Sequence, residues 1–264
     1  MIKDITIGQY MPGETSIHRL DPRVKILATI VYISILFFIK GFFSYLYVLG
    51  YLGTVIWLSE IPPKTILKSL KPLAVIIMLT LVFNIFMTPG ERLPGFGFIP
   101  ITKEGLYQAG YMGLRLMFLI TGASLLTLTT SPIALTDGIE KLLNPFKKIG
   151  VPAHELAMMM TIALRFIPTL LDETDKIMKA QMARGADFES GNLFSRAKAM
   201  IPLLVPLFIS AFRRAEELAL AIEARCYRGG ENRTRMKQLK LKGIDYSASL
   251  ITILLCIAII FTRK

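Results

Sequence analysis

The sequence has 264 residues, of which 53% are hydrophobic, yet it carries 31 Lys and Arg residues against 19 Asp and Glu residues. Together with a mean hydropathy of +0.54, this composition requires apolar spans and charged blocks to be segregated along the chain, as in an integral membrane protein. The formal net charge of +12 does not indicate a nucleic-acid partner, because the basic residues flank apolar runs, where membrane topology and anionic lipid headgroups account for them.

The cysteines, the histidines and the N-terminus exclude further classes. Cys226 lies in a polar stretch and Cys256 in an apolar run, so the pair indicates neither a disulfide framework nor a thiolate metal cage. His18 and His154 are not grouped with carboxylates at ligand spacing, so we expect no metal site and no cofactor in this chain. Residues 1–20 lack an apolar stretch followed by a small-residue cleavage site, so we expect no signal peptide to be removed.

Five segments approach the length of a transmembrane helix, which takes roughly 17 to 25 apolar residues. Turn-forming residues separate them, with Lys40 and Gly41 between the first two, Pro62 and Pro63 before the third, and a loop rich in Gly and Pro before the fourth. The sequence therefore predicts an all-α, polytopic membrane protein with about five transmembrane helices. The expected spans are residues 24–39, 42–58, 73–87, 105–128 and 244–261.

The distribution of Lys and Arg predicts the topology. With the N-terminus in the cytoplasm, twenty-five of these residues lie inside and five outside, and Arg115 remains within the fourth span. An odd number of spans then places the C-terminus outside the cell membrane.

The segment 131–243 is too long for a connecting loop, so it is expected to fold as a cytoplasmic domain of long helices. Apolar residues recur every three and four positions over 156–178 and again over 203–222, which predicts two long helices with one apolar face each. Between Met200 and Phe212 the apolar run contains two prolines, which favours a half-buried helix over a membrane span. The segment 133–149 is expected to be an amphipathic helix on the membrane surface. The predicted domains are 1–130, 131–243 and a last span within 244–264.

Both long helices are expected to end on an arginine between small residues. The first ends at Ala183, Arg184 and Gly185, and the second at Ala224, Arg225 and Cys226. Helix capping alone explains such an ending, since a C-terminal Arg favours the negative end of the helix dipole and Gly supplies a left-handed cap. Their duplication on the cytoplasmic side favours a second interpretation, in which each planar guanidinium binds an acidic groove on a partner.

Six short phrases occur in a fixed order along the chain. They are LDPRVK at 20–25, LRFIP at 164–168, the triplet at 183–185, PLLVP at 202–206, RAEELA at 214–219 and EARCY at 223–227. In these phrases the chain resembles the transmembrane T component of energy-coupling factor transporters, a family that includes subunits of cobalt and nickel uptake systems. The resemblance covers about residues 20–229, and one departure from it is Cys226, where the family more often has Gly.

The resemblance implies that this chain is a non-catalytic subunit of an ATP-driven importer for vitamins or transition-metal ions in a bacterial or archaeal cell membrane. Arg184 and Arg225, with their small neighbours, would each dock into one of two cytoplasmic ATPase subunits, which bind the ATP. A separate membrane component would capture the substrate. The sequence agrees with a partner as energy source, because no Gly-rich phosphate-binding loop occurs in it.

Methionines gather in the same cytoplasmic block and suggest a surface that adapts to exchangeable substrate-binding components. Ordinary core packing explains them equally well. The residues are Met158, Met159, Met160, Met178, Met182 and Met200.

Other readings of the sequence stay open. Asp21 and Pro22 fit an N-cap followed by a first-turn proline, and Arg115 is expected to pair inside the protein.

An alternative function is a polytopic membrane enzyme acting at the inner membrane interface, through His154 and the carboxylates of 172–175. These residues show no pattern of converging acids and bases. A structural protein that binds anionic lipid is a third reading.

Overall fold

The structure, a computed structural model, describes residues 10–39, 41–91, 102–188, 192–227, 229 and 239–262. Within these ranges the chain is helical and contains no β-strand, which confirms the all-α fold class. The described residues divide into two compact units, a first of residues 10–138 and 239–262 and a second of residues 139–227 and 229.

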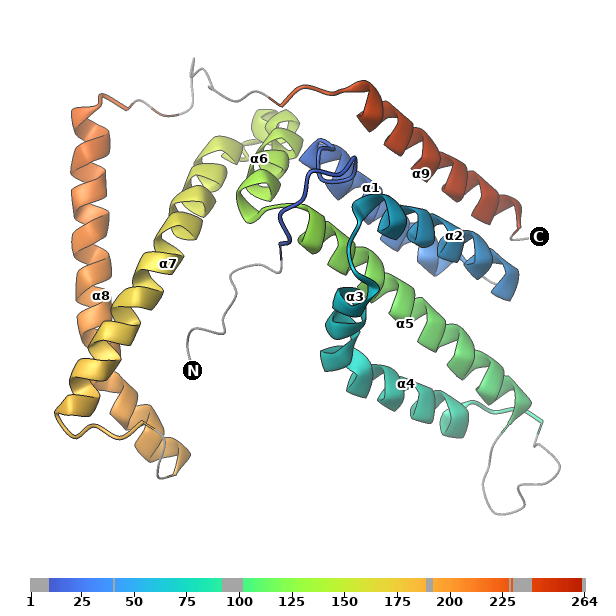
Figure 1. The fold of residues 1–264 in the computed structure, drawn as a ribbon, viewed down its shortest axis with the longest axis horizontal. Helices are drawn as coiled ribbons and strands as arrows, with labels where there is room; N and C mark the ends of the chain where they lie inside the picture. The colour runs from blue at the N-terminus through green and yellow to red at the C-terminus, as the bar shows by residue number, and fades with distance from the viewer. Residues whose placement is uncertain are drawn as a thin grey trace. The chain divides into compact units, whose positions relative to one another are not determined.

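The first unit is built around four helices that pack in a ring. Both α1 and α2 contact α5 and α9, while α3 and α4 pack against α5 (Figure 1). The elements of this unit are α1 (Pro22–Phe38), α2 (Phe42–Ser59), α3 (Pro63–Leu70), η2 (Lys71–Leu73), α4 (Ala74–Met87), α5 (Lys103–Thr129), the first part of α6 (Pro132–Leu143) and α9 (Gly243–Phe261).

The second unit contains the rest of α6, then η3 (Asn144–Ile149), α7 (Ala153–Ala183) and α8 (Leu193–Ala224). The break expected at Asn144 and Pro145 is where α6 gives way to η3. Gly150 then ends this segment with φ of +90°, a left-handed conformation that glycine adopts without steric cost.

The five expected spans correspond to α1, α2, α4, α5 and α9, each within two residues at either end. Among the described residues, six helical segments are long and apolar enough to cross a membrane, close to the expected number. These are Phe42–Ser59, Pro63–Met87, Lys103–Thr129, Ala153–Ala183, Phe194–Ala224 and Gly243–Phe261. Two of the six belong to α7 and α8, in the block expected in the cytoplasm, and α1 is not among the six. With 17 residues, α1 has the shortest length that spans a bilayer.

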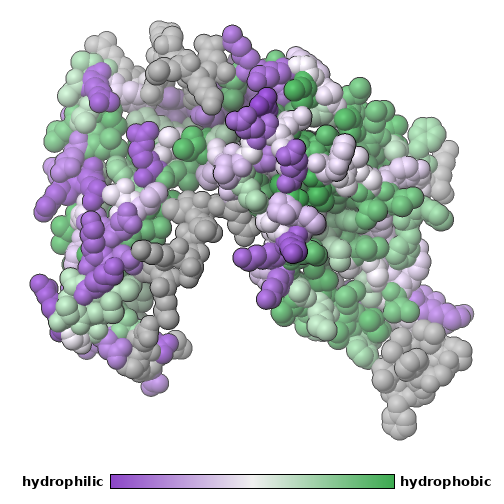
Figure 2. Space-filling model, viewed as in Figure 1, coloured by the Kyte–Doolittle hydropathy of each residue, from purple (hydrophilic) through white to green (hydrophobic). Residues whose placement is uncertain are grey.

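The first unit presents a wide apolar surface to its surroundings. None of the residues of α4 is buried, and Val75, Met78 and Met87 are each about 70% exposed. In the space-filling view, hydrophobic side chains cover much of the surface of this unit (Figure 2). Exposing so large an apolar surface to water is unfavourable, so this unit is expected to be embedded in the lipid bilayer.

Polar side chains join the start of α1 to the start of α9. Asp21 caps α1 by accepting a hydrogen bond of 2.9 Å from the Arg23 backbone, with Pro22 in the first turn as predicted. Its carboxylate also accepts from the Arg23 guanidinium at 2.8 Å. Burial alone would raise the pKa of the Asp21 carboxyl, but the hydrogen bonds from Arg23 outweigh it and hold that pKa below its ordinary value. Asp245 accepts from the backbone of Asp21 at 2.7 Å and from that of Lys242 at 2.6 Å.

Two cations inside the first unit bind the C-terminal carbonyls of neighbouring helices. Lys25 in α1 donates to the carbonyl of Thr129, the last residue of α5, at 2.8 Å. Reciprocally, Arg115 in α5 donates a hydrogen bond of 3.3 Å to the carbonyl of Ile39, the residue that caps the C-terminal end of α1. The Arg115 guanidinium also lies 4.8 Å from the centre of the Tyr111 ring. The interior pairing expected for Arg115 is thereby confirmed.

A glycine allows α1 and α5 to approach one another. A Cβ atom at Gly122 would collide with the ring of Tyr32. That ring is only 2% exposed, and its hydroxyl donates to the carbonyl of Phe118 at 3.0 Å. The tyrosine therefore has little freedom to move aside.

We expect Gly122→Ala to destabilise the chain by about 1–3 kcal/mol, the usual cost of overpacking a core. Gly53→Ala in α2 is the matched control, because its Cβ would meet nothing within 4 Å, and it should be neutral or stabilise by up to about 1 kcal/mol. Thermal unfolding of the purified chain in detergent measures both. Equal melting temperatures for the two variants would contradict the assigned packing.

Candidate functional site

The two long helices of the second unit form an antiparallel hairpin (Figure 1). Glu173 of α7 accepts from Arg214 of α8 at 2.8 Å and also from the hydroxyl of Ser210. Nearer the end of α7, Gln181 donates to the carbonyl of Pro202 at 3.4 Å. The partner numbers fall along α8 as they rise along α7, so the helices run in opposite directions.

A proline creates one of these contacts. Pro206 lacks the backbone N–H that would bind the carbonyl of Pro202 four residues earlier in the helix. That free carbonyl is the acceptor of the Gln181 side chain. The helix continues through both prolines as one element of 32 residues, so the apolar run from Met200 to Phe212 is the middle of a long helix.

Both helices end in the same backbone motif. The N–H of Gly185 donates to the carbonyl of Met182 at 2.9 Å, and that of Ala186 to Gln181 at 3.0 Å. At the end of α8, the N–H of Cys226 donates to Glu223 at 2.8 Å and that of Tyr227 to Ile222 at 3.3 Å. This pair of bonds defines a Schellman motif, which satisfies the last carbonyls of a helix.

The two arginines occupy matching positions in these motifs. Arg184 has φ −89° and ψ 8°, and Arg225 has φ −88° and ψ 9°. Both side chains are exposed, and neither guanidinium makes a hydrogen bond or ion pair with another described residue. The small neighbours Ala183, Gly185, Ala224 and Cys226 are exposed as well. As far as the described residues show, each helix therefore presents an unbound, permanently charged guanidinium fork at its end.

The antiparallel pairing places the two forks far apart. Glu173 pairs with Arg214 and Gln181 with Pro202. If this antiparallel pairing continues for one more turn of α7, Arg184 lies beside α8 near residue 199. At a rise of 1.5 Å per residue, Arg225 then lies roughly 40 Å further along α8. The hairpin thus offers two equivalent cationic ends rather than one combined site.

The residue after each arginine differs between the two ends. Gly185 adopts φ +87° without strain, whereas Cys226 adopts φ +54°, a left-handed conformation that costs a residue with a Cβ about 1 kcal/mol or more. Position 226 is therefore a place where the local backbone would favour glycine.

We expect Cys226→Gly to stabilise the chain by about 1 kcal/mol and Gly185→Ala to destabilise it by a similar amount, since a Cβ at 185 meets no neighbour and only the backbone preference changes. Cys226→Ser is the control, because it removes the thiol but keeps the strained backbone. Thermal unfolding followed by circular dichroism checks the three variants. If the serine variant gained as much stability as the glycine variant, backbone strain would not be the cause.

The methionines do not gather at one place. Met158, Met159 and Met160 lie near the start of α7, while Met178 and Met182 lie near its end, roughly 27 Å or more away by helical rise. Met159, Met182 and Met200 are exposed and the other three are half-buried. An adaptable platform, which stays a prediction, would consist of two separate patches.

One feature of α8 differs from the sequence expectation of a single apolar face. Leu203 is buried and Leu207 half-buried, yet large apolar side chains also stand exposed elsewhere on the helix. Ile201, Val205, Phe208 and Phe212 follow one another at spacings of four, three and four, and are 51–73% exposed. The sequence assigns Phe208 and Phe212 to the same apolar face as Leu203 and Leu207, whereas in the structure they are exposed together with Ile201 and Val205.

His154 and Glu173, which the alternative membrane enzyme would need for catalysis, bind other side chains and lie far apart. Glu173 is bound by Arg214 and Ser210, and His154 lies 3.1 Å from Glu140. His154 and Glu173 are on the same helix, roughly 28 Å apart by its rise. In the described part of the chain, no group of three or more His, Cys, Asp or Glu residues could hold a metal ion.

Comparison with known proteins identifies the family. Residues 13–236 match the family described as cobalt transport protein. The chain is 62% identical over 263 residues to the energy-coupling factor transporter transmembrane protein EcfT of Clostridium kluyveri, covering 98% of this chain and 97% of the relative. It is 60% identical to that of Thermosediminibacter oceani, covering 99% of each chain. The protein of the same name from Bacillus subtilis is 47% identical over the whole of both chains. The chain therefore belongs to the family of transmembrane proteins of energy-coupling factor transporters, and is a multi-pass membrane protein.

Proposed function

We propose that this chain is the coupling subunit of an importer for vitamins or transition-metal ions, and that Arg184 and Arg225 are the points where two cytoplasmic ATPase subunits attach. The observation that carries the proposal is the pair of matching helix ends, each an exposed arginine in a Schellman motif. Two equivalent ends require two equivalent acceptors. A dimer of ATPases offers one acidic groove on each subunit, and the roughly 40 Å between the forks suits two separate subunits.

The hairpin explains how motion would pass through the chain. A helix resists bending, so force applied at Arg184 or Arg225 moves the whole of α7 or α8 about their contact at Glu173 and Arg214. Closure of the ATPases upon ATP binding would change the angle between the two helices. A substrate-binding membrane component seated on them would then tip in the bilayer and release its substrate.

The remaining parts of the proposal concern ATP and membrane topology. ATP is bound by the partner subunits, and this chain itself is neither an enzyme nor a cofactor protein. The excess of Lys and Arg over 131–243 supports a cytoplasmic location for the hairpin, with the N-terminus inside and the C-terminus outside.

Substitution of the two arginines tests the attachment. Each of Arg184→Ala and Arg225→Ala should weaken binding of the ATPase subunits by well over tenfold, because losing one partner of a buried charge pair costs roughly 2–5 kcal/mol. The double variant should lose the complex and substrate uptake. Co-purification with tagged ATPase subunits and uptake by whole cells are the measurements.

Arg213→Ala is the matched control, since Arg213 is also exposed on α8 but lies away from either helix end. It should keep both ATPase binding and uptake. A double variant of Arg184 and Arg225 with full ATPase binding and full uptake would refute the proposed attachment.

A further inference from the structure

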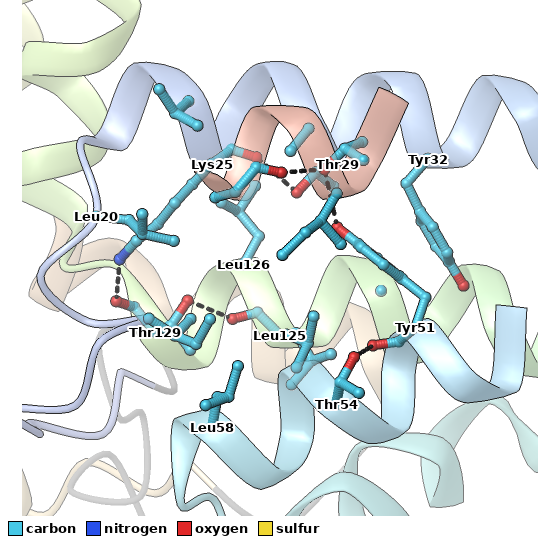
Figure 3. A pocket seen from close by; sticks show the side chains of 18 of the residues that line it. Leu20, Lys25, Thr29, Tyr32, Tyr51, Thr54, Leu58, Leu125, Leu126 and Thr129 are labelled. Atoms are coloured by element: carbon cyan, nitrogen blue, oxygen red, sulfur yellow. Dashed lines mark hydrogen bonds between the residues drawn. The ribbon is translucent and has the colours of Figure 1, made fainter. Parts of the chain in front are cut away.

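A partly open cavity of about 530 Å³ lies between α1, α2, α5 and α9 (Figure 3). Its volume is within the range of about 300–1,000 Å³ that is usual for small-ligand sites. All four helices contribute to its wall, and Ser16, Ile17 and Leu20 border it where α1 begins. Since α9 also begins and α5 ends there, this border lies at a level where lipid headgroups meet the ends of transmembrane helices.

The wall of the cavity is chemically simple despite its hydroxyl groups. Thr29 donates to the carbonyl of Lys25, Thr54 to that of Tyr51 and Thr252 to that of Ala248, all at 2.7–2.9 Å. The hydroxyls of Thr129 and Ser247 likewise donate to carbonyls of their own helices, so these protons are used within the protein. What the wall offers a ligand is the hydrocarbon of residues such as Leu125 and Ile251.

Among the residues that line the cavity, Lys25 is the one with a charged side chain. This residue is 8% exposed, and its side chain runs between α1 and α5 to end beside Leu20 and Thr129 at one end of the cavity (Figure 3). An ammonium carries three protons, and two of them bind the carbonyls of His18 and Thr129 at 3.1 and 2.8 Å. No carboxylate in the described ranges forms an ion pair with it. The Asp245 carboxylate attracts the ammonium without forming an ion pair with it. Among the described residues, one proton of the ammonium has no acceptor and is left for an anion.

We propose that this cavity binds an amphiphile that has an anionic head and a hydrocarbon chain, with the head at Lys25 and the chain between α1, α2, α5 and α9. Phospholipids with an acidic headgroup and free fatty acids share this chemistry. The apolar wall accounts for the chain, and the buried cation accounts for the negative charge.

Native mass spectrometry of the delipidated full-length chain in detergent tests the site with three probes, namely phosphatidylglycerol, oleate and phosphatidylcholine. We expect one molecule of phosphatidylglycerol or oleate to bind about tenfold more tightly than phosphatidylcholine, the discrimination that a hydrogen bond to a charged group provides. Binding of either acidic probe supports the proposal, and the tighter one identifies the head. Equal affinity for phosphatidylglycerol, oleate and phosphatidylcholine would overturn it.

Two variants locate the binding. Lys25→Met should abolish the preference for acidic heads, and Ala248→Phe, which places a large side chain in the cavity from α9, should weaken binding of the acidic probes at least tenfold. Leu250→Phe is the matched control on the same helix, because Leu250 is 58% exposed and does not line the cavity. If Lys25→Met does not fold, Ala248→Phe decides. Unchanged binding by Ala248→Phe, or equal loss in Leu250→Phe, would contradict the proposed site.

Discussion

The membrane unit depends on one constraint, which is that backbone carbonyls at helix ends need donors where water is absent. The chain meets it reciprocally between α1 and α5. Lys25 near the start of α1 binds the last carbonyl of α5, and Arg115 within α5 binds the carbonyl that caps α1. Each cation gains acceptors that offset part of the cost of its burial, and each helix end gains a donor. The two bonds lie at opposite ends of the pair, so together they set the register of α1 against α5.

The same carbonyl chemistry governs the hairpin. A carbonyl that Pro206 leaves unbonded in α8 accepts the side chain of Gln181, which ties α7 to α8 near the Arg184 end. Two Schellman motifs satisfy the last carbonyls of the two helices without using the arginine side chains. This explains how both arginines can stand at helix ends and still keep their guanidinium groups free. Helix capping and partner binding, which are competing explanations at the level of sequence, are compatible in the structure.

Much of the fold could be predicted because its signals are local. Apolar length, Pro and Gly placed α1, α2, α4, α5 and α9 within two residues, and the paired arginines marked the ends of α7 and α8. The contacts that join helices could not be predicted, because their partners are far apart in sequence. Asp245 binds the backbone of Asp21, 224 residues away, and Lys25 reaches across 104 residues to Thr129. Nothing in the spacing of either residue identifies such a partner.

The two units differ in how they are held together, and this difference suits the proposed coupling. Many fully buried side chains, including Leu36, Val48 and Ile259, stabilise the ring of α1, α2, α5 and α9. In contrast, Ala153, Ala157 and Leu203 are the buried apolar residues described in α7 and α8, and a few polar contacts such as Glu173 with Arg214 connect the two helices. Segments with few buried apolar contacts rearrange at lower free-energy cost than densely packed ones. The angle between α7 and α8 can therefore change while the packing of the membrane helices is preserved, which a coupling element driven by two ATPases requires.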